Sequence, residues 1–130
     1  MIIGIGTDLI NMKRVKKIYK KYDQRFLNKI LFDNEKKEFK KINNKLKKIK
    51  QINFIAKRFA AKEAIGKALG FGISFPVTFK SIEILNNNKG RPLSFFHNDL
   101  KVYFEKKKLS IHISLSDENN YVHAVAIIEV

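Results

Sequence analysis

Residues 52–70 read INFIAKRFAAKEAIGKALG. Alanine is the most frequent residue of this stretch and has the highest helix propensity, whereas Gly70 supplies a C-terminal stop. The stretch therefore predicts a long helix from Ile52 to Leu69. Glu63 and Lys67 are four residues apart, so we expect them on one face of this helix. The alanines would allow a neighbouring element to approach it closely.

The segment before this helix predicts one strand and three helices. Residues 2–6 are an apolar run that ends at a glycine, which indicates a short buried strand. Apolar residues at spacings of three and four predict a helix over 11–22 and a further turn or two over 26–31. A charged helix over 33–42 is expected next, with Asp33 as its N-cap.

The other segments complete an α+β pattern. Residues 43–50 contain two asparagines and four lysines and are expected to form an exposed connection. Four further elements are predicted, namely a strand over 79–85, a short helix over 100–104, and strands over 110–116 and 121–130. Residues 86–90 predict a turn, and Pro92 restricts the segment after it to an edge strand or a loop. We expect a single domain, residues 1–130, with a small antiparallel sheet of three or four strands, a long central helix and additional N-terminal helices.

The charge of the chain favours an anionic partner. The 130 residues include 27 Lys and Arg against 12 Asp and Glu, a net charge of +15. The excess is concentrated between Lys13 and Lys50, where 16 basic and 4 acidic residues give a net charge of +12. Such a field attracts nucleic acid, a membrane surface or an acidic protein. An AT-rich genome would also raise the lysine content, and composition leaves both interpretations open.

Composition also excludes several classes of protein. The chain has no cysteine, which excludes a disulfide scaffold and thiolate metal sites. Its longest apolar stretch, residues 121–130, is too short to cross a bilayer. The N-terminus lacks the pattern of a signal peptide. A soluble cytoplasmic protein without membrane insertion is therefore expected.

Asp8 and Glu63 are the first candidates for chemistry. Asp8 stands where the predicted first strand ends, beside Gly6, which permits close approach of a ligand. If Asp8 converges with Glu63, two hard oxygen ligands without a nearby His or Cys would suit Mg²⁺. Two simpler interpretations remain: Asp8 as the cap of the next helix, and Glu63 with Lys67 as a solvated pair.

A second candidate group lies on the strand predicted over 110–116. Strand alternation places His112, Ser114 and Ser116 together on one face. Two hydroxyls beside an imidazole could bind phosphate or orient the ring. A structural role for His112 is the alternative.

Three blocks of the sequence resemble the signatures of one enzyme family. They are Gly4-Ile5-Gly6-Thr7-Asp8, Arg58-Phe59-Ala60-Ala61-Lys62-Glu63-Ala64 with Lys67-Ala68-Leu69-Gly70, and Ile111-His112-Ile113-Ser114-Leu115-Ser116-Asp117. In order and spacing they are similar to the blocks of the holo-acyl-carrier-protein synthases, which have the 4′-phosphopantetheinyl transferase fold. Weaker similarity around Arg25, Glu83 and Gly90 extends the match over nearly the whole chain.

The resemblance implies a homotrimer with active sites at the subunit interfaces. Its implied reaction, part of fatty acid biosynthesis, moves 4′-phosphopantetheine from coenzyme A to a serine of an acidic acyl carrier protein and releases 3′,5′-ADP. By this resemblance Asp8 and Glu63 bind Mg²⁺, and Lys67 contacts phosphate. The group that takes the serine proton remains open between Glu63, His112 and a metal-bound water.

The resemblance also assigns the residues that contact the two substrates. Those implied near coenzyme A, besides Lys67, are Gly70, Gly72, His112 and Ser114, with Gly90, Arg91 and Pro92 near its nucleotide end. Arg14 and Arg25 are implied to dock an acidic helix of the carrier. Phe71 and Ser81 depart from residues frequent in the family, and Phe71 would alter the loop that closes over the coenzyme.

The main alternative is a nucleic-acid-binding module without catalysis. Basic residues interleave with aromatic residues over 19–39, and the sequence pI is about 10.0. These aromatics fall at helical core spacing, however, and the chain contains no known nucleic-acid-binding motif. No nucleic-acid partner is therefore expected.

Overall fold

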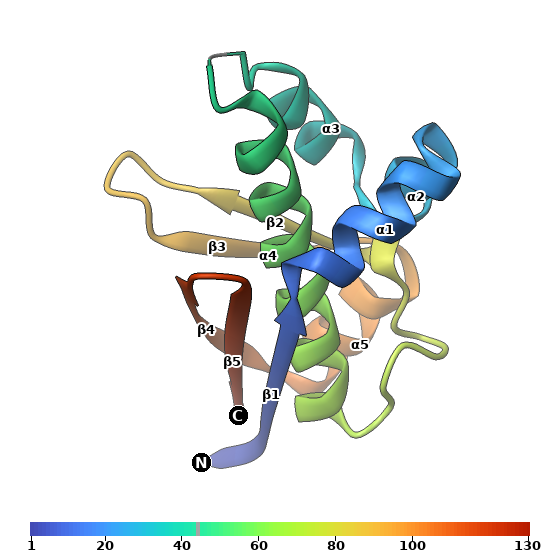
Figure 1. Ribbon diagram of the computed structural model, residues 1–130. Helices are drawn as coiled ribbons and strands as arrows, with labels where there is room; N and C mark the ends of the chain where they lie inside the picture. The colour runs from blue at the N-terminus through green and yellow to red at the C-terminus, as the bar shows by residue number, and fades with distance from the viewer. Residues whose placement is uncertain (44) are drawn as a thin grey trace.

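The computed structural model describes residues 1–43 and 45–130, which form two antiparallel sheets packed around one long helix (Figure 1). In chain order the elements are β1 (Ile2–Asn11), α1 (Met12–Tyr22), α2 (Gln24–Ile30), α3 (Asp33–Lys40), α4 (Lys47–Leu69), the 3₁₀ turn η1 (Phe79–Ser81), β2 (Ile82–Asn86), β3 (Pro92–Phe96), α5 (Asn98–Lys107), β4 (Ser110–Glu118) and β5 (Tyr121–Glu129). No helix in this part of the chain is long and apolar enough to cross a membrane.

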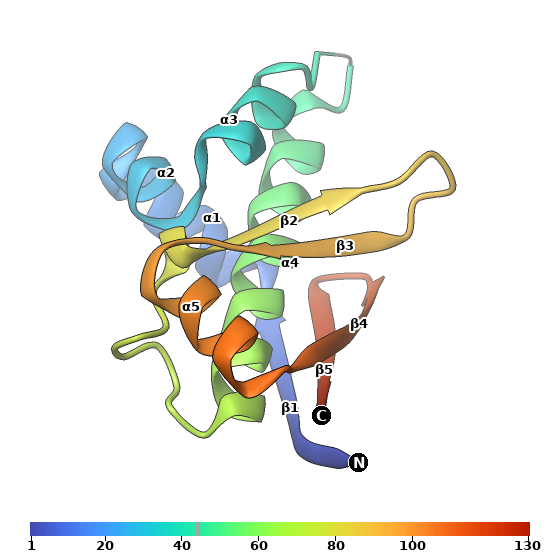
Figure 2. The same ribbon diagram turned by 180° about the vertical axis from the view of Figure 1, so that it is seen from behind.

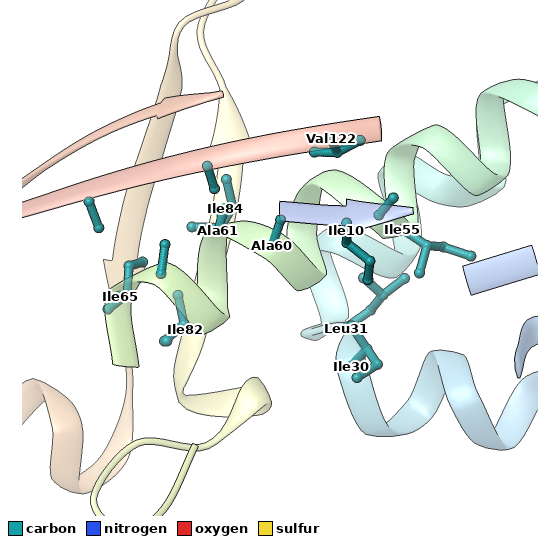
Figure 3. Packing of buried hydrophobic residues seen from close by; sticks show 14 of the residues in the cluster. Ile10, Ile30, Leu31, Ile55, Ala60, Ala61, Ile65, Ile82, Ile84 and Val122 are labelled. Atoms are coloured by element: carbon teal, nitrogen blue, oxygen red, sulfur yellow. The ribbon is translucent and has the colours of Figure 1, made fainter. Parts of the chain in front are cut away.

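The two sheets share the core with α4. One sheet has the strand order β1-β5-β4, and the other is the β2-β3 hairpin. Helix α4 runs through the middle of the molecule, with β1 and β5 against it and β2 beside it (Figures 1 and 2). Buried side chains from β1, α2, α4, β2 and β5 meet in one cluster that includes Ile10, Ile30, Ile65, Ile84 and Val122 (Figure 3).

The backbone of β1 lies directly against the backbone of α4. A Cβ atom added at Gly4 would stand 1.9 Å from the carbonyl oxygen of Ala68, and one at Gly6 would stand 2.0 Å from that of Ala64. No side chain fits at such distances, so both positions require glycine. The alternation of β1 points these glycines and then Asp8 toward α4, which aligns Asp8 with the helix.

A buried ion pair joins α4 to three other parts of the chain. Lys62 Nζ lies 2.5 Å from Glu35 Oε1 and donates a hydrogen bond of 2.6 Å to the carbonyl of Ile30. Glu35 also accepts hydrogen bonds from the N–H groups of Phe32, at 2.8 Å, and Ile84, at 3.0 Å. Both side chains are fully buried. Burial lowers the pKa of Lys62, and the charge of Glu35 opposes this shift.

The prediction for β1 was wrong in extent and in burial. The strand continues past Gly6 to Asn11, and Ile2, Ile3 and Ile5 are exposed. Successive residues of a strand point to opposite faces. Gly4 and Gly6 face α4, so Ile3 and Ile5 face away from it. The interpretation of Asp8 as a helix cap was also wrong, because the side chain of Asn11 accepts the hydrogen bond from the N–H of Lys13 that caps α1.

The remaining corrections concern boundaries. Helix α3 starts at Asp33, with Phe32 as its N-cap, and ends at Lys40. Residues 47–50 belong to α4 rather than to a connection, since lysine is a good helix former; Asn44 of that connection lies outside the described residues. The hydroxyls of Thr78 and Ser81 accept from each other's N–H groups, which closes η1 where a strand was expected.

The architecture otherwise agrees with the prediction. The long central helix, the N-terminal helices and the two closing strands are confirmed, and Pro92 begins an edge strand. The described residues form five strands in two sheets, however, where three or four in one sheet were expected. The class is α+β as predicted.

The contact between β1 and α4 predicts a large effect of a single methyl group. Gly6→Ala should lower the free energy of unfolding by about 1–3 kcal/mol, because the strand must move away from Ala64. Urea denaturation followed by circular dichroism measures this change. Thr7→Ala, on the exposed face of the same strand, should change it little. An unchanged midpoint for Gly6→Ala would contradict the close approach.

Candidate active site

Asp8 and Lys67 form an ion pair where β1 meets α4. Lys67 Nζ donates to Asp8 Oδ1 at 3.0 Å and to the carbonyl of Thr7 at 2.9 Å. The side chain of Asp8 is 16% exposed and that of Lys67 is 51% exposed. The Lys67 ammonium therefore reaches solvent, and the Asp8 carboxylate is held at the edge of the packed junction.

Glu63 lies one turn before Lys67 on α4, near the same carboxylate. Burial raises the pKa of Glu63, and the negative charge of Asp8 raises it further; the charges of Lys67 and Arg14 act in the opposite direction. The structure thus brings together Asp8, Glu63 and Lys67, as predicted. A carboxylate whose ionisation is disfavoured by burial and by a second carboxylate belongs to a site that a cation would stabilise.

The donor set fits Mg²⁺ rather than a closed structural metal. Among the described residues there is no group of three or more His, Cys, Asp or Glu side chains that could hold a metal ion. Asp8 and Glu63 would supply only two protein ligands, both hard oxygens. Mg²⁺ is commonly bound by one or two carboxylates and completes its shell with water and substrate phosphates. The pair therefore suits a cation shared with a phosphate ester.

Gly70 and Gly72 follow Lys67 at the C-terminal end of α4. Both have left-handed backbone conformations, with φ of +83° and +64°. The N–H of Gly70 donates to the carbonyl of Lys67, and that of Gly72 donates to the carbonyl of Gly66. The glycines end the helix and turn the chain immediately beyond the Lys67 side of the site.

The structure does not bring His112 and Ser114 to the carboxylates of the same chain. On β4, Ile111 and Ile113 pack toward the core, so the alternate residues His112 and Ser114 face away from α4. His112 Nε2 lies 2.8 Å from Glu129 Oε1 on the neighbouring strand, and this interaction lowers the pKa of Glu129. Strand β5 separates β4 from β1. These two residues therefore lie on the other face of the sheet from Asp8.

Gly90 and Pro92 belong to a third location. They line a groove of about 640 Å³ together with Arg58 and Asn86. Arg91 lies between them in the exposed hairpin turn, where its N–H donates to Asn87 Oδ1 at 2.9 Å. The predicted nucleotide-end residues are therefore together, and α4 provides the opposite wall of their groove.

Arg58 is the residue in this groove to which the sequence patterns assigned no role. It is 5% exposed, its Nη2 donates to Asn86 Oδ1 at 2.9 Å, and its guanidinium lies 3.7 Å from the centroid of the Phe54 ring. Burial lowers its pKa to about 10. Its buried Nε has no hydrogen-bond partner in residues 1–43 and 45–130. A buried guanidinium with an unused N–H is suited to an anion. The sequence contained one sign of this contact: Phe54 and Arg58 are four residues apart, so they lie on the same face of the helix.

Arg14 and Arg25 lie on the exposed surface of α1 and α2. Arg25 borders a hollow of about 440 Å³ that Ile18, Tyr22 and Phe26 also line. Its guanidinium is 5.6 Å from the centroid of the Tyr22 ring. An apolar floor with a basic rim is the surface that an acidic amphipathic helix would fit.

Known proteins are similar to this chain over nearly its whole length. The family model described as the 4′-phosphopantetheinyl transferase superfamily matches residues 4–126. The chain belongs to this superfamily. The matched range contains Asp8, Glu63, Lys67 and the groove around Arg58, so the resemblance carried by the three sequence blocks is confirmed.

Individual members of the superfamily resemble the chain over nearly their full length. A holo-[acyl-carrier-protein] synthase of Wigglesworthia glossinidia brevipalpis is 45% identical, over 98% of this chain and 92% of the relative. The crystal structure of holo-[acyl-carrier-protein] synthase from Neisseria meningitidis is 38% identical, with a TM-score of 0.90 and full coverage of both chains. A synthase structure from Bacillus anthracis, in complex with CoA (3′,5′-ADP), is 32% identical with a TM-score of 0.80, over 98% of this chain and 96% of that one.

Because the pKa of Glu63 is raised, we predict that removal of its carboxyl group stabilises the fold, and that the size of this effect depends on pH. The folded chain disfavours the ionised carboxylate of Glu63. The free energy of unfolding therefore falls as the pH rises from the pKa of this group in the unfolded chain to its raised pKa in the folded chain. Glu63→Gln should therefore raise the free energy of unfolding relative to the parent protein at pH 7. The difference should disappear below about pH 4, where the carboxyl is protonated in both states.

Denaturant titrations at the two pH values measure this difference. Glu118→Gln removes an exposed carboxylate at the far end of β4 and controls for the change in net charge. A Glu63→Gln protein that is less stable than Glu118→Gln at pH 7 would contradict the assigned electrostatics.

Proposed function

We propose that this chain transfers 4′-phosphopantetheine from coenzyme A to a serine of an acidic acyl carrier protein and releases 3′,5′-ADP. The observation that carries the proposal is the convergence of Asp8, Glu63 and Lys67 at the β1–α4 junction in a member of the transferase superfamily. In the proposed reaction the serine oxygen forms a bond to the β-phosphorus, and the bond from that phosphorus to the oxygen of 3′,5′-ADP breaks.

The residues of the junction supply what phosphoryl transfer requires. Asp8 and Glu63 would hold Mg²⁺, which supplies charge neutralisation for the pyrophosphate when bound. Lys67 extends a half-exposed ammonium beside them and is placed to bind a phosphate oxygen. Gly70 and Gly72 keep side chains away from the end of the helix, so a coenzyme can approach its backbone.

Two side chains, besides a metal-bound water, are candidates to accept the serine proton. Glu63 is one, because its carboxylate lies at the proposed site of transfer beside Lys67. His112 is oriented through its ring by Glu129 and is the alternative.

The separation of the predicted residues supports a homotrimer with sites between subunits. The face of the sheet that bears His112 also exposes Ile3, Ile5 and Leu9 of β1, at 52%, 62% and 64%. Monomeric proteins rarely expose a contiguous apolar face of this kind. A second copy packed there would cover the isoleucines and bring His112, Ser114 or the Arg58 groove to the carboxylates of its neighbour.

In this arrangement the Arg58 groove receives the nucleotide end of coenzyme A. The unused Nε of Arg58 would donate to a phosphate, while Gly90 and Pro92 border the nucleotide. The Bacillus anthracis relative was solved with CoA (3′,5′-ADP). A groove with a buried cation is consistent with the same ligand in this chain.

The carrier would dock on the basic surface of α1 and α2. Arg14 and Arg25 would pair with acidic residues of the carrier, and the apolar hollow beside Arg25 would take its apolar side chains. The charge of residues 13–50 would speed the encounter and make it sensitive to salt. The proposed reaction would take place in the cytoplasm and would serve fatty acid biosynthesis. The alternative of a noncatalytic nucleic-acid-binding module has no support, because the matched relatives are transferases.

The direct test is the mass of the carrier after incubation with the protein, coenzyme A and Mg²⁺. Apo acyl carrier protein should gain the mass of one phosphopantetheine. EDTA should prevent the gain, and Asp8→Asn should reduce its rate by at least about 100-fold, since Asp8 supplies one of the two carboxylates. Several carriers that all keep their mass with the folded parent protein would contradict the proposal.

A further inference from the structure

Lys62, which forms a buried ion pair with Glu35 of α3, directly precedes Glu63 on α4. We infer that Glu35 and Lys62 are positioning residues of the transferase, which fix the rotation of α4 and thereby hold Glu63 opposite Asp8. This inference rests on the proposed function and assigns neither residue a contact with substrate.

The position of Lys62 on the helix makes this role possible. Successive residues of an α-helix point about 100° apart, so Lys62 and Glu63 leave α4 in different directions. Glu63 lies one turn before Lys67, which donates to Asp8, so Glu63 faces the β1 side of α4. Lys62 enters the core and ends at Glu35 and the carbonyl of Ile30. A rotation that moves Glu63 away from Asp8 would also pull the Lys62 ammonium from both partners.

Glu35 connects this ammonium to α3, where Glu35 lies, and to two other parts of the chain. One oxygen accepts from Lys62 and from the N–H of Phe32, before α3, and the other accepts from the N–H of Ile84 in β2. Both charged side chains are fully buried. Loss of the contact between Lys62 and Glu35 would leave two buried charges without their counter-charge, which is costly. Rotation of α4 is therefore resisted from α2, α3 and β2 together.

The restraint on the opposite side of α4 is more exposed, because the hydrogen bonds to Asp8 and to the carbonyl of Thr7 come from Lys67, whose side chain is 51% exposed. There the helix meets Gly4 and Gly6, which have no side chains to interlock with Ala64 and Ala68. The glycines therefore fix the distance between strand and helix, whereas the buried pair adds hydrogen bonds that depend on the direction of the Lys62 side chain. Buried ion pairs often contribute little net stability compared with apolar residues of similar volume, so directional restraint is the more specific role for this pair.

The consequence for catalysis is geometric. A displacement of about 1 Å in a group that holds a substrate or cation can reduce the rate about 100-fold. Supporting residues that lock such groups are therefore as necessary as the groups themselves. If Lys62 sets the direction of Glu63, its loss should weaken cation binding even where the fold survives.

The test measures Mn²⁺ binding by electron paramagnetic resonance in the presence of saturating 3′,5′-ADP, so the readout is independent of turnover. Lys62→Met keeps an unbranched side chain and removes the ammonium. Its Mn²⁺ dissociation constant should rise about tenfold, the size of effect typical when the support of a metal ligand is lost. The kcat of transfer should fall, and the KM for the carrier should stay within about twofold of the parent value because Arg14 and Arg25 remain.

Matched variants separate positioning from stability and charge. Ile65→Val removes one methylene from a fully buried residue of the same helix and leaves the pair intact, while Lys106→Met removes an exposed charge on α5. Both should bind Mn²⁺ within about twofold of the parent protein. The double variant Glu35→Gln/Lys62→Met leaves no unpaired buried charge and should fold, with Mn²⁺ binding weakened like that of Lys62→Met.

The outcomes distinguish the inference from the function on which it rests. A folded Lys62→Met or double variant that binds Mn²⁺ as tightly as the parent would overturn the positioning role alone. Equal weakening by Ile65→Val at the same loss of thermal stability would overturn it too, because destabilisation would then explain the effect. A parent protein that binds no Mn²⁺ would overturn the proposed function as well.

Discussion

The backbone of β1 lies against the backbone of α4, and this contact depends on the missing side chains of Gly4 and Gly6. The next residue on that face of the strand is Asp8, so its carboxylate emerges where the helix presents Glu63 and Lys67. Residues far apart in the sequence thus converge because a strand can approach a helix of small residues closely. The chemistry of the site depends on this packing.

The electrostatics of the site are unfavourable without a partner. Asp8 and burial together disfavour the ionised form of Glu63, and Lys67 offsets only part of that cost. In the proposed function, a divalent cation would neutralise the two carboxylates, and Lys67 would remain to bind a phosphate ester. On the core side of the same helix, the buried pair of Glu35 and Lys62 adds further directional hydrogen bonds.

Local patterns were sufficient to predict α4 and the shared face of Glu63 and Lys67, whereas the family resemblance implied that Asp8 joins them. Local patterns were not sufficient for β1, because the faces of a strand depend on which residues its neighbour buries, and here glycines rather than isoleucines face the helix. Nor did they show that His112 lies across the sheet from Asp8, which depends on the pairing of β4 with β5. Arg58 was missed because a charged residue on a helix is normally exposed, whereas here Phe54 and Asn86 cover it.

A crystal structure of the protein with coenzyme A and Mg²⁺ tests the central claim most directly. The account predicts a metal ion between Asp8 and Glu63 that also contacts the pyrophosphate, with Lys67 turned to a phosphate oxygen. It further predicts the nucleotide in the Arg58 groove of a neighbouring copy. A metal ion bound elsewhere, or a coenzyme that contacts neither Lys67 nor either carboxylate, would contradict the claim that the glycine contact builds the active site.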